Sequence, residues 1–265
     1  MTSLPTLDNI PRALRERPQW VVWKYEARDD GGKLTKVPYQ ARYPQRKASS
    51  KAAHTWSDVR VALSTAHKHG FDGIGYVFSA DDPFAGFDLD NILDEQGAVA
   101  DWAQPWLAQL PTYVEISPSG RGVKGIVCGK LPGSGVNAGS VEVYDQGRYF
   151  AITGQRFDGA PAEPQSVNGA LDRLYAFAQE RKAQYEAERE VRRQRAYAEK
   201  ALANEADRVR NAPEGMRNDR LNRAAFAVAG FIQSGLLSED EIVDALADAA
   251  GIAGLAHVEI RATLR

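Results

Sequence analysis

The change of residue pattern that begins near residue 162 most constrains what this chain can fold into. Before it, short runs of β-branched and aromatic residues alternate with Gly, Pro and Asp clusters, a pattern typical of strands joined by turns. After Gly169 no Gly or Pro occurs until Pro213, and Ala, Glu, Arg, Lys and Gln dominate. That composition is typical of one or two long charged helices. We therefore expect an α+β part followed by a helical part.

This pattern predicts three domains. They are an α+β domain over residues 1–165, a charged helical linker over residues 166–212 and a small helical domain over residues 213–265. Within the last, Ser238–Glu241 is a capping box that begins a helix. The final helix reaches the end of the chain without a cap, so we expect the sequence to be the front part of a longer protein.

The α+β part is expected to hold one small mixed or antiparallel sheet flanked by helices. Its first two strands would form a hairpin around a turn at Asp29–Gly32. Apolar periodicity and glycine punctuation predict flanking helices at Trp56–His69 and Val99–Leu110. The strands expected on the same grounds are Trp20–Tyr25, Leu34–Tyr39, Ile74–Phe78, Ala85–Leu89, Tyr113–Ser117, Val123–Cys128, Ser140–Tyr144 and Arg148–Thr153.

Two carboxylates, Asp88 and Asp90, come two residues apart at the end of one of these strands. Residues i and i+2 of a strand point to the same face, so the two would stand side by side. Like charges at that separation repel unless a cation lies between them, and oxygen ligands suit Mg²⁺ or Mn²⁺. The alternative is that one aspartate starts a turn and the other caps a helix.

Further candidate groups lie on the later strands. Glu142 alternates with valines, and a buried unpaired glutamate is costly, which favours a ligand or ion-pair role. A glycine-framed turn precedes Lys124, and its backbone N–H groups could approach a phosphate, with Ser119 and Arg121 as further donors. Hairpin turns of this composition without any ligand are commoner.

Charge is unevenly distributed although the net charge is only −2. Residues 1–60 carry 12 Lys+Arg against 6 Asp+Glu, and residues 61–110 carry 1 against 8. No acid lies between Lys33 and Lys51, a segment that includes Lys36, Arg46 and Lys47. A basic segment facing an acidic metal site would suit a polyanion held by its phosphates. A solvated basic loop is the alternative.

The cellular compartment follows from what the sequence lacks. A single cysteine, Cys128, excludes an internal disulfide framework and fits a reducing compartment. The N-terminus has no basic region followed by an apolar core, and no apolar run is long enough for a membrane span. We expect a cytoplasmic protein that does not enter the membrane.

With these residues placed, roughly residues 10–160 resemble the primase-polymerase domain of the archaeo-eukaryotic primase superfamily, in its phage and plasmid replication branch. Gly73–Phe78 together with Phe87–Asp90 is similar to the first motif, whose aspartates bind metals. Glu115–Lys124 is similar to the second, a phosphate-binding turn, and Glu142–Phe150 to the third, whose acid completes the metal site. The resemblance implies an RRM-like sheet with flanking helices and a separate helical C-terminal domain.

The resemblance also implies a function, template-directed nucleotidyl transfer that makes primers and extends DNA. Asp88, Asp90 and Glu142 would hold Mg²⁺ or Mn²⁺, and single-stranded DNA and NTP or dNTP would be the partners. The phosphates would be held by Lys124, Ser119 and Arg148, with Lys36, Arg46 and Lys47 as weaker candidates. Tyr149 would press on the sugar unless it is a plain core tyrosine, and Glu115 is either a site acid or structural.

The family usually has histidine where this chain has Lys124, and lysine can pair with a phosphate as a point charge but not as a neutral imidazole. Related phage proteins often continue into a helicase, so a helicase domain C-terminal to this chain is an expected partner. The chain has no Gly-x-x-x-x-Gly-Lys-[Ser/Thr] motif of its own. Two alternatives stay open, a non-catalytic module that binds single-stranded DNA or an origin, and a metal-dependent nuclease.

Overall fold

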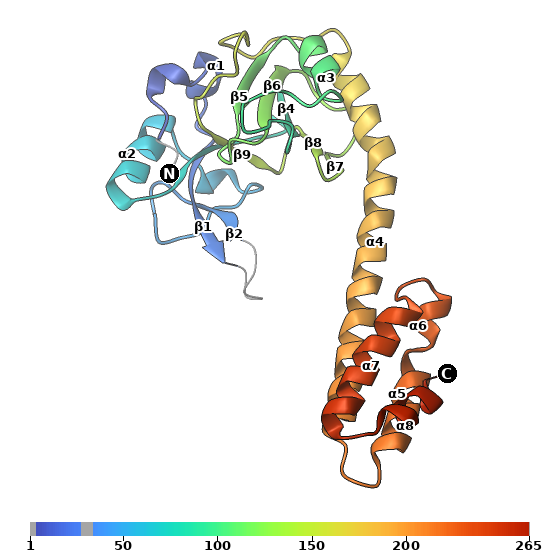
Figure 1. Ribbon diagram of the computed structural model, residues 1–265. Helices are drawn as coiled ribbons and strands as arrows, with labels where there is room; N and C mark the ends of the chain where they lie inside the picture. The colour runs from blue at the N-terminus through green and yellow to red at the C-terminus, as the bar shows by residue number, and fades with distance from the viewer. Residues whose placement is uncertain (1–3, 28–33, 265) are drawn as a thin grey trace. The chain divides into compact units, whose positions relative to one another are not determined.

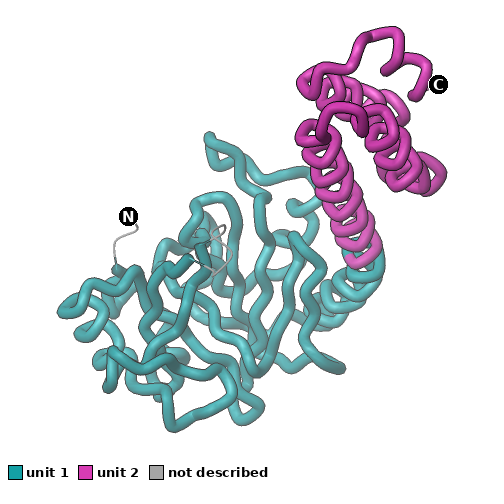
Figure 2. The backbone as a smooth tube through the Cα atoms, turned by 90° about the horizontal axis from the view of Figure 1, so that it is seen from below, with its two compact units in different colours: residues 1–185 teal, residues 186–265 magenta. Residues whose placement is uncertain are grey.

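A computed structural model describes residues 4–27 and 34–264, and in it the chain divides into two compact units, residues 1–185 and 186–265 (Figure 2). The turn expected at Asp29–Gly32 lies outside the described residues. The first unit contains all the strands of the described chain, and the second is helical (Figure 1). The expected α+β class with a helical C-terminal region is confirmed. None of the described helices is long and apolar enough to cross a membrane.

The strands of the first unit form two sheets instead of the single sheet expected, and every pairing between named strands in the described chain is antiparallel. The four-stranded sheet has the order β2-β1-β3-β9 and the five-stranded sheet the order β5-β6-β4-β8-β7. The strands are β1 (Trp20–Ala27), β2 (Leu34–Tyr39), β3 (Gly73–Val77), β4 (Phe84–Leu89), β5 (Tyr113–Ile116), β6 (Val123–Cys128), β7 (Val136–Asn137), β8 (Val141–Tyr144) and β9 (Tyr149–Ile152).

The chain crosses between the sheets at short turns from β3 to β4 and from β8 to β9, so these consecutive strands do not pair with each other. Between β3 and β4, the buried carboxylate of Asp82 accepts hydrogen bonds from the backbone N–H groups of Ser79 at 3.0 Å and Phe84 at 2.8 Å. It also accepts one from the amide of Gln19 at 2.6 Å. The turn is therefore held by buried polar contacts that strand periodicity does not reveal.

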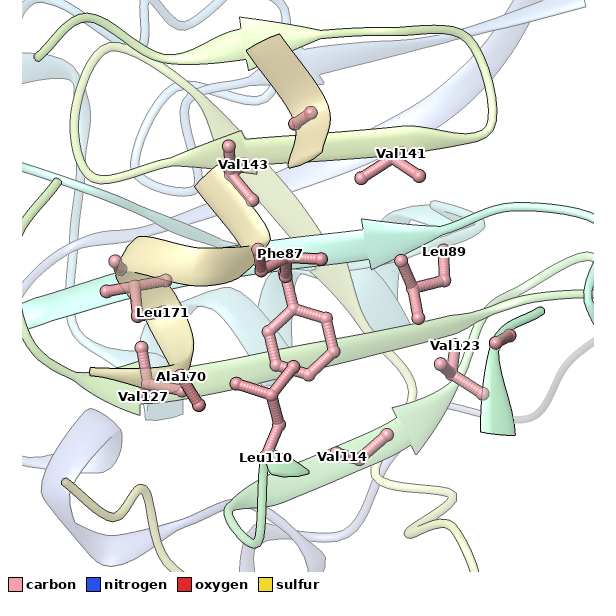
Figure 3. Packing of buried hydrophobic residues seen from close by; sticks show 14 of the residues in the cluster. Phe87, Leu89, Leu110, Val114, Val123, Val127, Val141, Val143, Ala170 and Leu171 are labelled. Carbon is pink, nitrogen blue, oxygen red and sulfur yellow. The ribbon is translucent and has the colours of Figure 1, made fainter. Parts of the chain in front are cut away.

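Two hydrophobic clusters stabilise the first unit. In one, Phe84, Tyr113, Ile126 and Tyr144 of the five-stranded sheet join residues of the four-stranded sheet and of α1 (Arg12–Arg15) and α2 (Val59–His69). The other lies on the opposite face of the five-stranded sheet. Figure 3 shows its side chains from β4, β6 and β8 beside residues of α4: Phe87, Leu89, Val123, Val127, Val141, Val143, Ala170 and Leu171.

Both flanking helices of the first unit lie where expected but are shorter, and α2 begins at Val59 instead of Trp56. Helix α2 ends at Gly70, which adopts the left-handed conformation at φ 65° that favours glycine. The helix expected over Val99–Leu110 is shorter, because α3 covers only Gln104–Gln109. Pro105 stands in its first turn, the helical position that tolerates proline, and the residues before it form turns.

Helix α4 (Ala170–Arg210) is a single helix of 41 residues, and the boundary between the units falls within it. Its first turns contribute Leu171, Leu174 and Ala178 to the cluster against the five-stranded sheet. Further along, Ala198, Leu202 and Val209 belong to the core of the second unit. The segment expected to be a linker thus takes part in the core of each unit.

The second unit packs four further helices with the end of α4. They are α5 (Arg217–Val228), α6 (Gly230–Gln233), α7 (Glu239–Ala253) and α8 (His257–Thr263). The capping box at Ser238 is present, since its hydroxyl accepts from the backbone N–H of Glu241 and the Glu241 carboxylate accepts from that of Ser238. Leu221 and Leu246 lie in the core, fully buried.

Candidate active site

Charged side chains from neighbouring strands form a row across one face of the five-stranded sheet. In the strand register, Asp88 of β4 lies directly opposite Glu142 of β8 and Lys124 of β6. Residues directly opposite each other in antiparallel strands project to the same face. The row continues to Asn137 of β7 and Glu115 of β5. Three of the acids and cations that the sequence predicted are therefore brought together by strand pairing.

Asp88 and Lys124 form a buried ion pair, in which the Lys124 ammonium donates to Asp88 Oδ2. The side chains are only 8% and 9% exposed, so the charges depend on each other for compensation. Burial and repulsion from Lys36 lower the pKa of Lys124, while the charge of Glu142 acts in the opposite direction. The second carboxylate oxygen, Asp88 Oδ1, is buried and finds no hydrogen-bond donor among the described residues.

Glu142 is half-buried beside this pair. Its Oε1 accepts a hydrogen bond from the side-chain amide of Asn137 at 2.5 Å. Burial raises the pKa of Glu142, Lys124 lowers it, and the negative charge of Asp90 raises it again. The charges of Lys124 and Asp90 therefore both act on the Glu142 carboxylate.

Asp90 lies just beyond the end of β4 and is half-buried. Its backbone N–H donates to the carbonyl of Ser140 at 2.9 Å, which ties it to the start of β8. Lys36, on β2 of the other sheet, has its pKa lowered by burial and raised by the charge of Asp90. The charge of Lys36 also lowers the pKa of Lys124, so Lys36 lies close enough to the row to act on its charges.

The turn that joins β5 to β6 lies next to Asp90. A Cβ atom added to Gly122 would lie 2.6 Å from the carbonyl oxygen of Leu89 and 3.3 Å from Asp90 Oδ1, so only glycine fits this close approach. Ser119 Oγ lies 2.9 Å from Ser117 Oγ and accepts from the backbone N–H of Arg121 at 3.3 Å. The hydroxyl thus holds the turn together and stays at its exposed surface.

Arg148 acts on the charge of Glu142, whereas the neighbouring Tyr149 contacts β2 of the four-stranded sheet. The Arg148 guanidinium lies 4.9 Å from the centre of the Tyr144 ring, and its charge lowers the pKa of Glu142. The Tyr149 hydroxyl donates to the carbonyl of Lys36 at 2.8 Å, and its ring packs over Gly75. The Tyr149 hydroxyl therefore joins β9 to β2 instead of pointing at the carboxylates.

Glu115 is fully buried at the end of the row. Its carboxylate accepts three hydrogen bonds, from the backbone N–H groups of Thr153 at 2.9 Å and Gly154 at 3.0 Å and from the Tyr113 hydroxyl at 2.7 Å. Burial raises its pKa to about 7 even though these donors lower it. Glu115 thus connects β5 of one sheet to the segment after β9 of the other, as a structural acid would.

The basic segment after β2 is partly neutralised by its own ion pairs. Lys47 Nζ lies 3.4 Å from a Glu26 carboxylate oxygen, and Arg42 lies 3.5 Å from Asp58. Arg46 instead lies over the ring of Tyr43, at 5.4 Å. Lys47 is therefore less available for phosphate than its charge alone indicated.

Asp88 and Glu142 carry oxygen atoms of the kind that a hard divalent cation binds. Asp88 presents an orphaned buried oxygen, Glu142 lies on the adjacent strand, and the Lys124 ammonium holds the position of a cation against the other Asp88 oxygen. Over residues 4–27 and 34–264, no three His, Cys, Asp or Glu side chains are close enough together to surround a metal ion.

Asn137, which orients Glu142, was missed by the sequence reasoning. It lies on β7, a strand of two residues inside a segment expected to be a loop. Two residues are too few for an alternating pattern, so only the asparagine itself, five residues before an acid in the third motif, could have drawn attention to it.

Part of the chain is similar to a known protein. The chain is 42% identical over 155 residues to a curated protein named DNA primase-polymerase from Nitratiruptor phage NrS-1. The match covers 56% of this chain and 21% of that relative, so the chain spans about a fifth of the relative's length. No family model matches the chain. The chain therefore contains a region related to part of a phage DNA primase-polymerase, as its motifs indicated.

Proposed function

We propose that this protein is a template-directed nucleotidyltransferase that makes primers, and extends DNA, in phage or plasmid replication. The proposal depends chiefly on the strand register, which sets Glu142 of β8 opposite Asp88 of β4 on one side and Lys124 of β6 opposite it on the other. The sequence similarity to a phage DNA primase-polymerase supports the same reading. Single-stranded DNA and NTP or dNTP would be its partners, with a helicase, in the cytoplasm of a bacterial host.

Asp88, Asp90 and Glu142 would hold Mg²⁺ or Mn²⁺ in this proposal. The bound ions would supply charge neutralisation at the phosphates and a more acidic attacking 3′-hydroxyl. Among the chain's own groups, the orphaned Asp88 Oδ1 offers an acceptor, and Asn137 fixes the direction of Glu142. This orientation would keep the Glu142 carboxylate facing Asp88.

Lys124, Lys36 and the turn at Ser119 would bind the triphosphate. The Lys124 ammonium, which donates to Asp88 Oδ2, would pair with a phosphate oxygen as a point charge. Lys36 lies in reach of both Asp90 and Lys124, and would add a second positive charge. The exposed Ser119 hydroxyl and neighbouring backbone N–H groups would supply neutral donors at the edge of the sheet.

The test is incorporation of labelled nucleotides on a single-stranded template with Mg²⁺ or Mn²⁺. We expect the double substitution Asp88→Asn with Asp90→Asn to lower incorporation at least about 100-fold, since loss of groups that merely support a metal ligand already costs 10- to 100-fold. Template affinity should persist. Unchanged incorporation would refute the site, and degradation of the template without synthesis would identify a nuclease.

A second candidate is a non-catalytic module that binds single-stranded DNA. The Asp88–Lys124 ion pair favours it, because this lysine already neutralises the carboxylate that would hold the metal. The two functions differ in one result of the same assay, since such a module would bind the template and incorporate no nucleotide in its wild-type form.

A further inference from the structure

A cavity of about 480 Å³ opens beside the candidate active site. It is lined by the end of the basic segment and the residues after it, by the segment after β3 and by the turn between β8 and β9. The lining includes Lys51, Trp56, Tyr144 and Arg148. A volume of this size is typical of small-ligand pockets. None of the roles proposed above for the acids, Lys124 or Ser119 uses this cavity, whereas Arg148, which the family resemblance assigned to the nucleotide's phosphates, lines it.

Trp56 offers an aromatic surface to the cavity. Within the described parts of the chain, it belongs to none of the three hydrophobic clusters, although it is half-buried. Its indole N–H donates to the carbonyl of Ser49 at 2.7 Å, so the polar edge of the ring is satisfied and its orientation is fixed. A fixed indole that lines a cavity instead of a core is suited to stacking against a planar ligand.

Two cations share the cavity with Trp56. Lys51 and Arg148 line it, and no Asp or Glu is found among its described lining residues. Arg148 lies 4.9 Å from the centre of the Tyr144 ring. Aromatic surfaces beside cations are typical of sites that bind a nucleobase together with its phosphate.

The walls of the cavity are held by hydrogen bonds between segments far apart in the sequence. The Ser50 hydroxyl donates to the carbonyl of Gly147 at 2.7 Å. The backbone N–H of Phe78 donates to Arg148 at 2.9 Å, and that of Gly147 to Phe78 at 3.1 Å. The cavity is thus formed before any ligand arrives, which lowers the entropic cost of binding.

The cavity adjoins the Glu142 end of the acid row. Tyr144 follows Glu142 by two residues on β8, so both project to the same face, and the Arg148 charge lowers the pKa of Glu142. The turn containing Ser119, where the triphosphate would bind, lies instead beside Asp90. Along the strands, the two sites therefore lie on opposite sides of the row.

We propose that this cavity binds one nucleotide of the single-stranded template, with the base against Trp56 and a phosphate at Lys51 and Arg148. The proposal rests on the proposed function and adds a template site to it. Exposed Tyr43, with Arg46 over its ring at 5.4 Å, extends the pattern of aromatic and cationic groups along the basic segment. A polynucleotide needs such a repeated pattern, whereas a free nucleotide does not.

The test is the affinity of a short fluorescent oligothymidylate, measured by anisotropy with EDTA present and no nucleoside triphosphate. Trp56→Ala should bind about 5- to 150-fold more weakly, whereas Trp56→Phe, which keeps a stacking surface, should stay within about threefold of wild type. Lys51→Ala should weaken binding and reduce the slope of log K against log salt by about 0.7. Lys68→Ala, an exposed lysine of α2 outside the cavity, is the matched control and should bind like wild type.

Lys51 is exposed, so Lys51→Ala tests the proposal even if Trp56→Ala folds poorly. Wild-type affinity and salt slope in Lys51→Ala, together with wild-type affinity in a folded Trp56→Ala, would overturn the proposal. So would an unchanged oligonucleotide affinity with a raised KM for nucleotide, which would assign the cavity to the incoming nucleotide. If the cavity variants lose oligonucleotide affinity while wild type incorporates no nucleotide, the template site stands and the proposed enzymatic function fails.

Discussion

The ion pair between Lys124 and Asp88 makes each residue necessary to the other. Removing one partner of a buried pair leaves an uncompensated charge, which costs about 3–5 kcal/mol. We therefore expect Lys124→Ala to lower the free energy of unfolding of the first unit by about this amount. Urea unfolding followed by tryptophan fluorescence measures it selectively, because all 5 tryptophans lie between Trp20 and Trp106.

Mn²⁺ provides a second readout of the same residue. If Asp88 is a metal ligand, Mn²⁺ should raise the unfolding midpoint of Lys124→Ala more than that of wild type, because the ion replaces the lost ammonium and binds only the folded state. The double substitution Lys124→Ala with Asp88→Asn is the control and should lose this extra gain. An equal effect of Mn²⁺ on all three proteins would argue against a metal at Asp88.

Glu115 predicts a pH dependence of stability. Its folded-state pKa of about 7 lies above the ordinary value of 4.5, so the folded state holds the proton more tightly than the unfolded state. The stability from this group is present below about pH 4.5 and is lost as the pH rises through about 7. Glutamine does not titrate, so Glu115→Gln should not lose this stability as the pH rises.

The free energy of unfolding of Glu115→Gln, relative to wild type, should therefore rise by up to about 3 kcal/mol from pH 4.5 to pH 7.5. Urea titrations of both proteins at several pH values measure the difference, and the constant offset from the altered hydrogen bonds cancels. Parallel curves for the two proteins would show that Glu115 has an ordinary pKa.

Among the helices, α7 has the clearest local start signal. Replacement of an N-cap serine by alanine costs about 1 kcal/mol, so Ser238→Ala should destabilise the second unit by about that amount. Ser238→Asp keeps a capping oxygen and should stay close to wild type. Unfolding followed by circular dichroism at the helix band reports the second unit, while tryptophan fluorescence should show no change in the first.

Sequence patterns revealed helices and strands better than they revealed which strands pair. The hairpin of β1 with β2, helix α2 with its Gly70 end and the capping box of α7 depend on neighbours within a few residues, and all three are present. At one crossing between the two sheets, the turn from β3 to β4 is held by the buried carboxylate of Asp82, which looks like an ordinary turn residue in the sequence. Long-range polar contacts of this kind leave no periodic signal.

The candidate site was predictable to a similar extent. Spacing identified Asp88, Asp90 and Glu142, and the resemblance between the motifs and a known family linked them. Neither could show that Lys124 would bond Asp88, that Asn137 would hold Glu142 or that the Tyr149 hydroxyl would bond the Lys36 carbonyl. These contacts depend on strand register and on the other sheet, which the sequence does not encode locally.

At the scale of the whole molecule, α4 determines where the chain can be divided. Residues 170–178 contribute Leu171 and Leu174 to the core of the first unit, and burial of each leucine is worth about 1.5–3 kcal/mol. A fragment 1–185 should therefore fold with wild-type tryptophan fluorescence, whereas 1–165 should lose several kcal/mol, a large share of an ordinary domain's stability. Equal urea midpoints for the two fragments would contradict the assignment of the first turns of α4 to this core.

The most direct test of the account compares Glu142→Gln with Glu115→Gln in nucleotide incorporation on a primed single-stranded template. The two substitutions are chemically identical and lie on the same row of the same sheet, on β8 and β5, with β4 and β6 between them. We predict that Glu142→Gln lowers incorporation at least about 100-fold with template affinity retained, while Glu115→Gln, assayed where it is folded, stays within about tenfold of wild type. Full incorporation by Glu142→Gln would contradict the central claim that the Asp88–Glu142 pair is the catalytic site.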